Sequence, residues 1–329
     1  MEATMTQSQA VGRTAGRFAG RFAGAIAVVA ALAAPLGAAP AREEKGQTFQ
    51  APGATLYVEV LGTAAGVPLV VVNGGPGFDH TYEHAAVPGV KSAWDTLANK
   101  RRVAFYDQRG NGRSGALKPG QPCGLAEQID DLEAVRAHLG ADQIDLLGHS
   151  WGGFLVMAYA ARHPEHIRHL ITVDSAAPKW SDTVFLFKDV FPDGMERSDG
   201  YAFADALGDK AASDAGLREY LTWLFYSPEK RDAFIAQVGP SVFTKPVNEA
   251  VEHDVARFDL NPELRKFKFP TLVITGRYDI NVAPSVAFKI HRAIAGSKFV
   301  VLEKSGHLPF YEEPEAFVRT VETFLTAGR

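Results

Sequence analysis

Apolar runs that alternate with stretches of helical periodicity limit the possible fold of this chain more than any other feature. Residues 125–140 and 151–163 carry apolar side chains at helical spacing. The apolar runs before, between and after these stretches predict strands. These runs are VPLVVV (67–72), RRVAFYD (101–107), QIDLLGH (143–149) and IRHLITV (167–173). The first run is the most continuously apolar, which is typical of a strand covered on both faces. Strands that alternate with helices predict an α/β fold with a mostly parallel sheet and helices on both faces.

A segment rich in aromatic residues, 178–265, interrupts this alternation and contains no clear strand pattern. The alternation resumes with LVITGRYD (272–279) and KFVVLEKSGH (298–307). We expect a helical cap, or lid, at 178–265, inserted between the two parts of one core domain at 42–177 and 266–329. A plain second packing unit is the alternative for this segment.

The first residues predict a signal peptide at 1–41. Arg13, Arg17 and Arg21 precede the alanine- and valine-rich run FAGAIAVVAALAA, and small residues follow it, which is the order of a secretory leader. The run is short for a membrane span, which needs about 20 strongly apolar residues. We therefore expect cleavage near Ala39 to Ala41 and export to the periplasm or the medium, without stable membrane insertion afterwards. A retained N-terminal anchor is the alternative.

Composition excludes several classes of function. The net charge is −4 and basic clusters are absent from the sequence, which argues against nucleic acid or an anionic membrane as a partner. Cys123 is the only cysteine, so an intrachain disulfide and a cysteine-built metal site are both impossible. We expect neither a metal nor an organic cofactor, and a small molecule or short peptide as substrate. The oligomeric state is left open.

The candidate nucleophile is Ser150, in the sequence GHSWGG between a predicted strand and a predicted helix. This matches the G-x-S-x-G pattern in the strand–turn–helix context that gives the pattern its meaning. The sharp turn lifts the serine hydroxyl out of the sheet, and glycines at 148 and 152 avoid side-chain clashes around it. Nucleophiles of epoxide hydrolases and dehalogenases are carboxylates, so those reactions are disfavoured.

A serine hydroxyl needs a base that removes its proton, and a carboxylate that orients the base. Asp279 ends the run LVITGRYD, and His307 ends KFVVLEKSGH. Both come at the carboxyl ends of predicted strands, where open α/β sheets bind their ligands. The order serine, aspartate, histidine is that of the α/β-hydrolases. We predict a triad of Ser150, Asp279 and His307.

The loop NGGPG (73–77) leaves a buried strand with almost no side chains. Attack by a serine creates an oxyanion that needs backbone N–H donors close to it. We predict that Gly75, from this loop, and Trp151, after the nucleophile, supply those two N–H groups.

Together these motifs resemble the α/β-hydrolases, and within them the proline iminopeptidases. NGGPG, YDQRGNGRS, GHSWGG, GRYD and SGH follow one another as the corresponding motifs do in that family, where the first reads HGGPG. The resemblance covers the chain after the leader, most clearly outside 178–265. It implies the triad and the oxyanion donors named above.

Two positions depart from the family. Asn73 stands where the family usually has histidine, and Ser241 lies in a stretch that carries a glutamate in some members. The resemblance implies that glutamates of the cap hold the free amino group of the substrate. Glu249 and Glu252 are candidates for this role, and a solvated helix face is the alternative for both.

Other polar residues receive structural interpretations. Asp107 and Arg109 are expected to pair as a buried brace beneath the site, and His149 to pack beside the nucleophile. His163, His166 and His169 are expected at the surface rather than around a metal ion, since Pro164 breaks the helix between them.

The sequence therefore predicts an exported serine hydrolase that works through an acyl-enzyme. The first substrate class is peptides with an N-terminal proline, released by aminopeptidase activity. The alternative is an esterase or lactonase acting on small carboxylic esters. A ligand-binding protein that keeps the fold without turnover is a third possibility, and the complete set of triad residues disfavours it.

Overall fold

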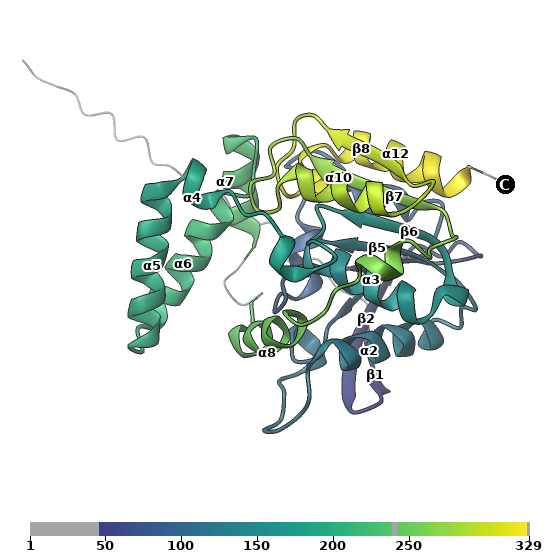
Figure 1. The fold of residues 1–329 in the computed structure, drawn as a ribbon, viewed down its shortest axis with the longest axis horizontal. Coiled ribbons are helices and arrows are strands. Elements are labelled where there is room, and N and C mark those ends of the chain that lie inside the picture. The colour runs from purple at the N-terminus through teal and green to yellow at the C-terminus, as the bar shows by residue number, and fades with distance from the viewer. Residues whose placement is uncertain (1–45, 239–242, 328–329) are drawn as a thin grey trace, which may run out of the picture. The chain divides into compact units, whose positions relative to one another are not determined.

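A computed structural model describes residues 46–238 and 243–327 (Figure 1). The predicted signal peptide lies outside the described residues. The described part contains an eight-stranded sheet in the order β1-β2-β4-β3-β5-β6-β7-β8. Its strands are β1 (Gln47–Ala51), β2 (Ala54–Leu61), β3 (Leu69–Val72), β4 (Val103–Asp107), β5 (Ile144–His149), β6 (Ile167–Val173), β7 (Thr271–Gly276) and β8 (Lys298–Leu302). The mostly parallel sheet predicted from the sequence is confirmed.

Strand β3 lies at the centre of the sheet, between β4 and β5, and is parallel to both. Its unbroken apolar run has a simple cause, because successive side chains point to opposite faces. Val70 and Val72 belong to the hydrophobic cluster on one face, and Leu69 and Val71 to the cluster on the other. Only the first part of the sheet departs from parallel pairing, since β2 is antiparallel to both β1 and β4.

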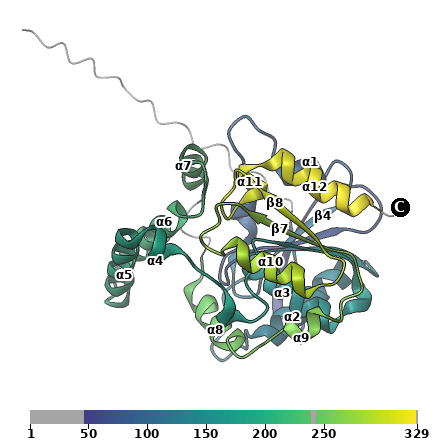
Figure 2. The ribbon, with the colours of Figure 1, turned by 45° about the horizontal axis from the view of Figure 1, so that its top comes forward.

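Helices cover the two faces of the sheet (Figure 2). On one face, α1 (Ala93–Leu97) and α12 (Pro314–Thr326) bury Trp94 and Phe317 against the sheet. The other face is covered by α2 (Leu125–His138), α3 (Trp151–Arg162) and α10 (Pro284–Ala293). Burying one large apolar side chain contributes about 1.5–3 kcal/mol, so these two layers supply most of the stabilisation of the core. The short helices outside these layers are η1 (His80–His84), η2 (Gly112–Ser114), η3 (Pro164–His166), η4 (Trp180–Asp182) and α11 (Pro309–Glu312).

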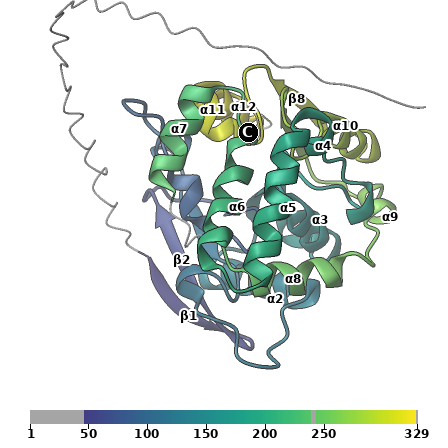
Figure 3. The same ribbon diagram turned by 90° about the vertical axis from the view of Figure 1, so that its left-hand side faces the viewer.

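The chain between β6 and β7 is helical, as the sequence predicts. Its helices are α4 (Phe187–Val190), α5 (Pro192–Ala206), α6 (Lys210–Thr222), α7 (Pro228–Gln237), α8 (Lys245–Val255) and α9 (Asn261–Leu264). Helices α5 and α6 run side by side (Figure 3). A backbone bridge between Phe78 and Phe243 connects this insertion to the loop that follows β3. Among the described helices, none is long and apolar enough to cross a bilayer.

Candidate active site

Ser150 occupies the sharp turn between β5 and α3. Its φ of 55° and ψ of −121° are unusual for a residue with a side chain, and such strain is concentrated at functional sites. The turn is fixed by backbone bonds: Ser150 N donates to Val173 O at 2.9 Å, and Ala176 N donates to Ser150 O at 3.1 Å. The serine is 8% exposed, so its hydroxyl lies at a surface that is nearly closed.

Glycines allow the chain to pack this tightly around the serine. A Cβ atom at Gly148 would lie 2.2 Å from Gly152 O, and one at Gly152 would lie 2.1 Å from Val72 O. Real side chains do not approach backbone oxygens so closely, so neither position can carry one. The G-x-S-x-G spacing is therefore a consequence of packing β3, β5 and α3 together.

Two backbone N–H groups beside Ser150 are available to a ligand. None of the hydrogen bonds within the described residues uses the N–H of Gly75 or that of Trp151. Trp151 opens α3, where the first N–H groups lack intrahelical partners. Gly75 has a φ of +132°, and a Cβ atom there would lie 2.7 Å from Gly77 N. The NGGPG loop thus supplies one of these donors and the start of α3 the other, and both residues line the cavity at Ser150.

The side-chain amide of Gln108 connects the loop that carries Gly75 to the side chain of Trp151. Its Nε2 donates to Asn73 O at 2.9 Å, and its Oε1 accepts from Trp151 Nε1 at 2.9 Å. Asn73 Nδ2 donates in turn to Phe78 O at 2.7 Å and closes the NGGPG loop on itself. An asparagine can therefore hold this loop at the position where the family usually has histidine. The sequence did not reveal the role of Gln108.

His307 and Asp279 are brought together as predicted. His307 Nδ1 lies 2.8 Å from Asp279 Oδ2, and both side chains are buried. Asp279 Oδ1 accepts from the backbone N–H groups of Asn281 at 2.8 Å and Val282 at 2.9 Å. Burial lowers the pKa of His307 to about 4 and raises the pKa of Asp279, because it disfavours the charged form of each group. A neutral imidazole with Nδ1 donating to the carboxylate leaves Nε2 as a proton acceptor.

The third contact of the predicted triad is not formed in this structure. Ser150 Oγ makes no hydrogen bond to any described residue, and His307 Nε2 lies 2.8 Å from Asn281 Nδ2 instead. Ser150 and His307 nevertheless line the same small cavity, of about 30 Å³, together with Gly75. The asparagine amide thus donates a hydrogen bond to Nε2, the acceptor atom that the serine hydroxyl requires. Asn281 is a site residue that sequence reasoning missed.

A second buried carboxyl group lies behind the pair of Asp279 and His307. Asp174, at the end of β6, accepts from Thr275 Oγ1 at 3.0 Å and from Gly276 N at 2.8 Å. Burial raises the pKa of Asp174 well above its usual range, and the negative charge of Asp279 raises it further. A protonated Asp174 leaves the single negative charge of the two carboxyl groups on Asp279.

A chain of hydrogen bonds links the base to the oxyanion loop. His149 Nε2 lies 2.8 Å from His307 O, and a carbonyl only accepts, so Nε2 carries the proton. Burial lowers the pKa of His149, so Nδ1 is unprotonated and accepts from Tyr82 OH at 2.7 Å. The Tyr82 oxygen accepts from Gly74 N at 2.7 Å. His149 is therefore a buried neighbour of the nucleophile, as expected, and also part of a continuous link.

A larger cavity of about 430 Å³ opens above Ser150, between the carboxyl edge of the sheet and the helical insertion. It is lined by Gly75, Ser150 and Trp151 and by aromatic side chains of the insertion, among them Phe187 and Tyr220. Glu249 and Glu252, both on α8, line it as well. Partial burial in the cavity raises the pKa of Glu252, although both glutamates keep contact with solvent. Because they also line the same cavity as the serine, both interpretations made from the sequence remain: a contact to the amino group of the substrate, or a solvated helix face.

Two structural predictions from the sequence are wrong. Asp107 and Arg109 do not pair: Arg109 Nε and Nη2 bind the buried carboxylate of Asp131 at 2.6 and 2.7 Å, and Asp107 binds His80. His169 is buried, because its Nδ1 lies 2.8 Å from Asp145 Oδ1 at the centre of the sheet.

His163 and His166 are partly exposed, as expected. Glu133 of α2 lies 3.1 Å from His166 Nδ1. Helices distant in sequence supply this partner, which is why periodicity within one segment does not reveal it.

Comparison with known proteins identifies the family of this chain. A family model for the alpha/beta hydrolase fold matches residues 67–314. The chain is 30% identical over 278 residues to a proline iminopeptidase of Saccharolobus solfataricus, which covers 78% of this chain and 84% of the relative. It is 29% identical over 279 residues to a proline iminopeptidase of Heyndrickxia coagulans, covering 80% and 91%.

Solved structures share the fold. An enol-lactonase from Burkholderia xenovorans matches with a TM-score of 0.66 at 25% identity, over 85% of this chain and 100% of that one. An esterase from Rhodococcus matches with a TM-score of 0.68 at 24% identity, over 86% and 98%, and supports the fold alone. The chain belongs to the α/β-hydrolase family, and within it is similar to proline iminopeptidases.

Proposed function

We propose that this hydrolase is a serine aminopeptidase that releases N-terminal proline from short peptides. The observation that carries the proposal is the position of Ser150, on a strained turn beside the unused N–H groups of Gly75 and Trp151. The same serine shares a small cavity with His307, whose other ring nitrogen binds Asp279. The similarity to proline iminopeptidases supports the substrate class.

In the proposed reaction, His307 Nε2 accepts the proton of Ser150 Oγ as the oxygen attacks the scissile carbonyl carbon. Asn281 must first turn its amide away from Nε2, because one lone pair cannot accept both groups. The carbonyl oxygen becomes an oxyanion, which Gly75 N and Trp151 N stabilise; losing one such donor typically costs about 10²–10³ in rate. Protonated His307 then gives its proton to the leaving amine, and Ser150 keeps the acyl group.

Water completes the cycle by the same route. His307 removes a proton from the water as it attacks the acyl carbon, and Ser150 Oγ leaves with that proton. Asp279 holds the imidazole in the required tautomer throughout and stabilises its transient positive charge. No step requires a group beyond the residues of this chain and water.

The helical insertion supplies the proposed specificity. We propose that helices α4 to α8 act as a lid, whose aromatic side chains surround a small ring in the 430 Å³ cavity. Glu249 and Glu252 would hold the positively charged amino group of the substrate, since both carboxylates line that cavity. A blocked amino group would then be rejected, which distinguishes an aminopeptidase from a general amidase.

The second candidate function is hydrolysis of small carboxylic esters or lactones. The match to an enol-lactonase at 25% identity favours it, since the same serine, base and donors act on an ester with a better leaving group. The unoccupied donors and the apolar cavity fit this substrate class as well.

Proline β-naphthylamide, N-acetylproline β-naphthylamide and p-nitrophenyl acetate separate these functions. We expect the enzyme to cleave proline β-naphthylamide and to cleave the N-acetylated substrate only slowly. For proline β-naphthylamide, Glu249→Gln or Glu252→Gln should lower kcat/KM by about tenfold or more, the equivalent of one charged hydrogen bond. Cleavage of p-nitrophenyl acetate should be unchanged in both variants, and Glu263→Gln on α9 is the matched control. Rapid ester cleavage without amide cleavage would support the second function, and absence of all turnover would support a binding protein.

A further inference from the structure

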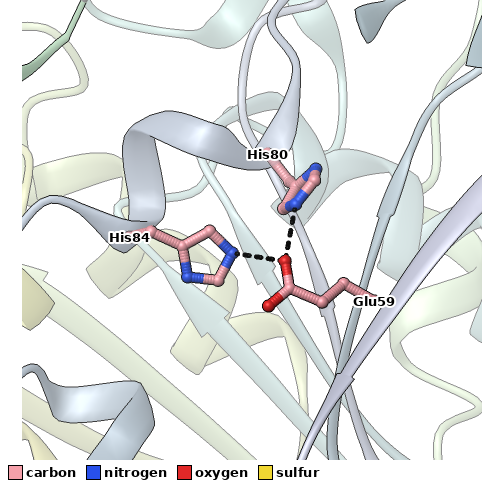
Figure 4. A group of neighbouring side chains, drawn as sticks. All are labelled: Glu59, His80 and His84. Carbon is pink, nitrogen blue, oxygen red and sulfur yellow. Dashed lines mark hydrogen bonds and ion pairs between the residues drawn. The ribbon is translucent and has the colours of Figure 1, made fainter. Parts of the chain in front are cut away.

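A buried group of two histidines and a glutamate lies away from the proposed active site (Figure 4). Glu59 comes from β2, and His80 and His84 are the first and last residues of η1. The side chains of Glu59, His80 and His84 are 2%, 0% and 7% exposed. None of the three lines either cavity at Ser150.

The two distances from the carboxylate to the histidines are long for hydrogen bonds and fit ligands around a small cation. Glu59 Oε2 lies 3.4 Å from His80 Nε2 and also 3.4 Å from His84 Nε2. Charge-assisted hydrogen bonds are shorter, at about 2.7–2.9 Å. Two ligand atoms bound tetrahedrally to zinc at about 2.0–2.1 Å lie about 3.4 Å apart. All three ligand atoms are within 4.8 Å of one another, so a single ion can reach them together.

A carboxylate behind His80 orients its ring for this role. His80 Nδ1 lies 2.6 Å from Asp107 Oδ1, and Asp107 is itself held by the N–H of Arg113, which donates to Oδ2 at 2.8 Å. Metal-binding histidines almost always donate their second ring nitrogen to a carboxylate or carbonyl in this way. With Nδ1 donating to Asp107, the lone pair of Nε2 is directed to the side of Glu59.

We infer that Glu59, His80 and His84 form a site for zinc or a cation of similar ligand preference. Two imidazoles and one carboxylate suit Zn²⁺, Co²⁺ or Ni²⁺, whereas Mg²⁺ and Ca²⁺ prefer oxygen ligands throughout. His84 is the least buried of the three side chains, at 7% exposed. Water would fill the fourth position.

The role of this site is structural. The ion would join β2 to η1, and η1 directly follows the loop that carries Gly75. The same three residues also form a network without a metal if a proton on His80 holds Glu59 and Asp107 together. The zinc-bound group and the proton-bound group differ in the number of metal ions per chain, which can be measured.

The test uses the full chain, stripped with a chelator and titrated with ZnCl₂ alone. We expect one bound zinc per chain that depends on this group, and a rise in Tm of about 5 °C at saturating zinc. Glu59→Gln and His84→Asn should each lose this zinc and the rise in Tm. His166→Asn removes a ligand of a second, partly exposed group, Glu133, His163 and His166, and this variant should keep both the zinc and the rise in Tm.

Co²⁺ provides a second readout, because a tetrahedral site gives it intense visible absorption that hexa-aqua Co²⁺ lacks. If Glu59→Gln does not fold, His84→Asn decides the question, since His84 is the ligand nearest to solvent. Zinc content and Tm shift that are equal in the wild type and in folded His84→Asn would overturn the inference. So would zinc that is lost only in His166→Asn.

Discussion

Asn281 Nδ2 lies 2.8 Å from His307 Nε2, the ring nitrogen that accepts the proton of Ser150 in the proposed mechanism. The amide donates and the neutral imidazole accepts, so this bond uses the lone pair on which catalysis depends. Asn281 also lines the larger cavity, beside Ser150 and Val282. The structure therefore corresponds to a state in which the base is protected rather than engaged.

Removing this amide should activate the serine. We expect Asn281→Ala to increase the rate at which a fluorophosphonate modifies Ser150 by about 2- to 10-fold, the equivalent of one neutral hydrogen bond. The measurement is stopped-time labelling followed by intact mass. Asn99→Ala, at an exposed position that lines neither cavity at Ser150, should react at the wild-type rate. Slower labelling of Asn281→Ala would mean that the asparagine orients the base.

The two titratable groups of the proposed triad should lose their catalytic forms in a fixed order as the pH falls. Burial raises the pKa of Asp279 to about 7 and lowers the pKa of His307 to about 4, so the carboxylate takes up a proton before the imidazole does. A protonated Asp279 no longer fixes the imidazole tautomer, so we expect kcat/KM to fall as the pH drops below about 7 and to fall more steeply below about 4. A pH profile with an ester substrate checks this, and a constant kcat/KM from pH 7 to 5 would contradict the raised pKa of Asp279.

The same two groups should have opposite effects on stability. The unfolded chain binds a proton at His307 as the pH falls through about 6.5, whereas the folded chain does so only near pH 4, so the contribution of His307 is complete above pH 6.5 and is lost as the pH falls towards 4. Asp279 opposes this loss, because the folded chain protonates it near pH 7 and the unfolded chain only near pH 4. Circular dichroism at each pH separates unfolding from protonation of the folded enzyme.

Tyr82 should position the oxyanion loop and the base at the same time. Tyr82→Phe leaves Gly74 N and His149 Nδ1 without their shared partner in a buried place. We expect a loss of about 1–3 kcal/mol in the free energy of unfolding and a lower kcat with little change in KM. Urea denaturation and steady-state kinetics measure the two effects.

A matched control separates this effect from the loss of any tyrosine hydroxyl. Tyr226 is 43% exposed, and Tyr226→Phe should change neither quantity. A purely structural role for Tyr82 would lower stability and leave kcat intact in the folded fraction.

Much of the fold and the centre of the site are visible in the sequence for physical reasons. The strands β3 to β7 are mostly apolar runs, because helical layers cover both faces of that part of the sheet. Gly148 and Gly152 beside Ser150 are required because a Cβ atom at either position would lie 2.1–2.2 Å from a backbone oxygen. The motifs around Gly75, Asp279 and His307 mark the carboxyl ends of strands that meet at one edge of the sheet.

The remaining features depend on contacts between distant segments. The partner of Arg109 is Asp131, from α2, rather than the neighbouring Asp107, which binds His80 instead. Gln108 joins Asn73 to Trp151 through one amide, and no periodicity signals such a bridge. Asn281 follows Asp279 by two residues, and only the turn of the backbone brings its amide to His307.

The most direct test of the proposed chemistry is the intact mass of the chain after treatment with a fluorophosphonate. We predict one adduct per chain in the wild type and in Ser198→Ala, which changes another serine that lines the cavity, and no adduct in Ser150→Ala. Labelling of Ser150→Ala at the wild-type rate would contradict the assignment of Ser150 as the nucleophile.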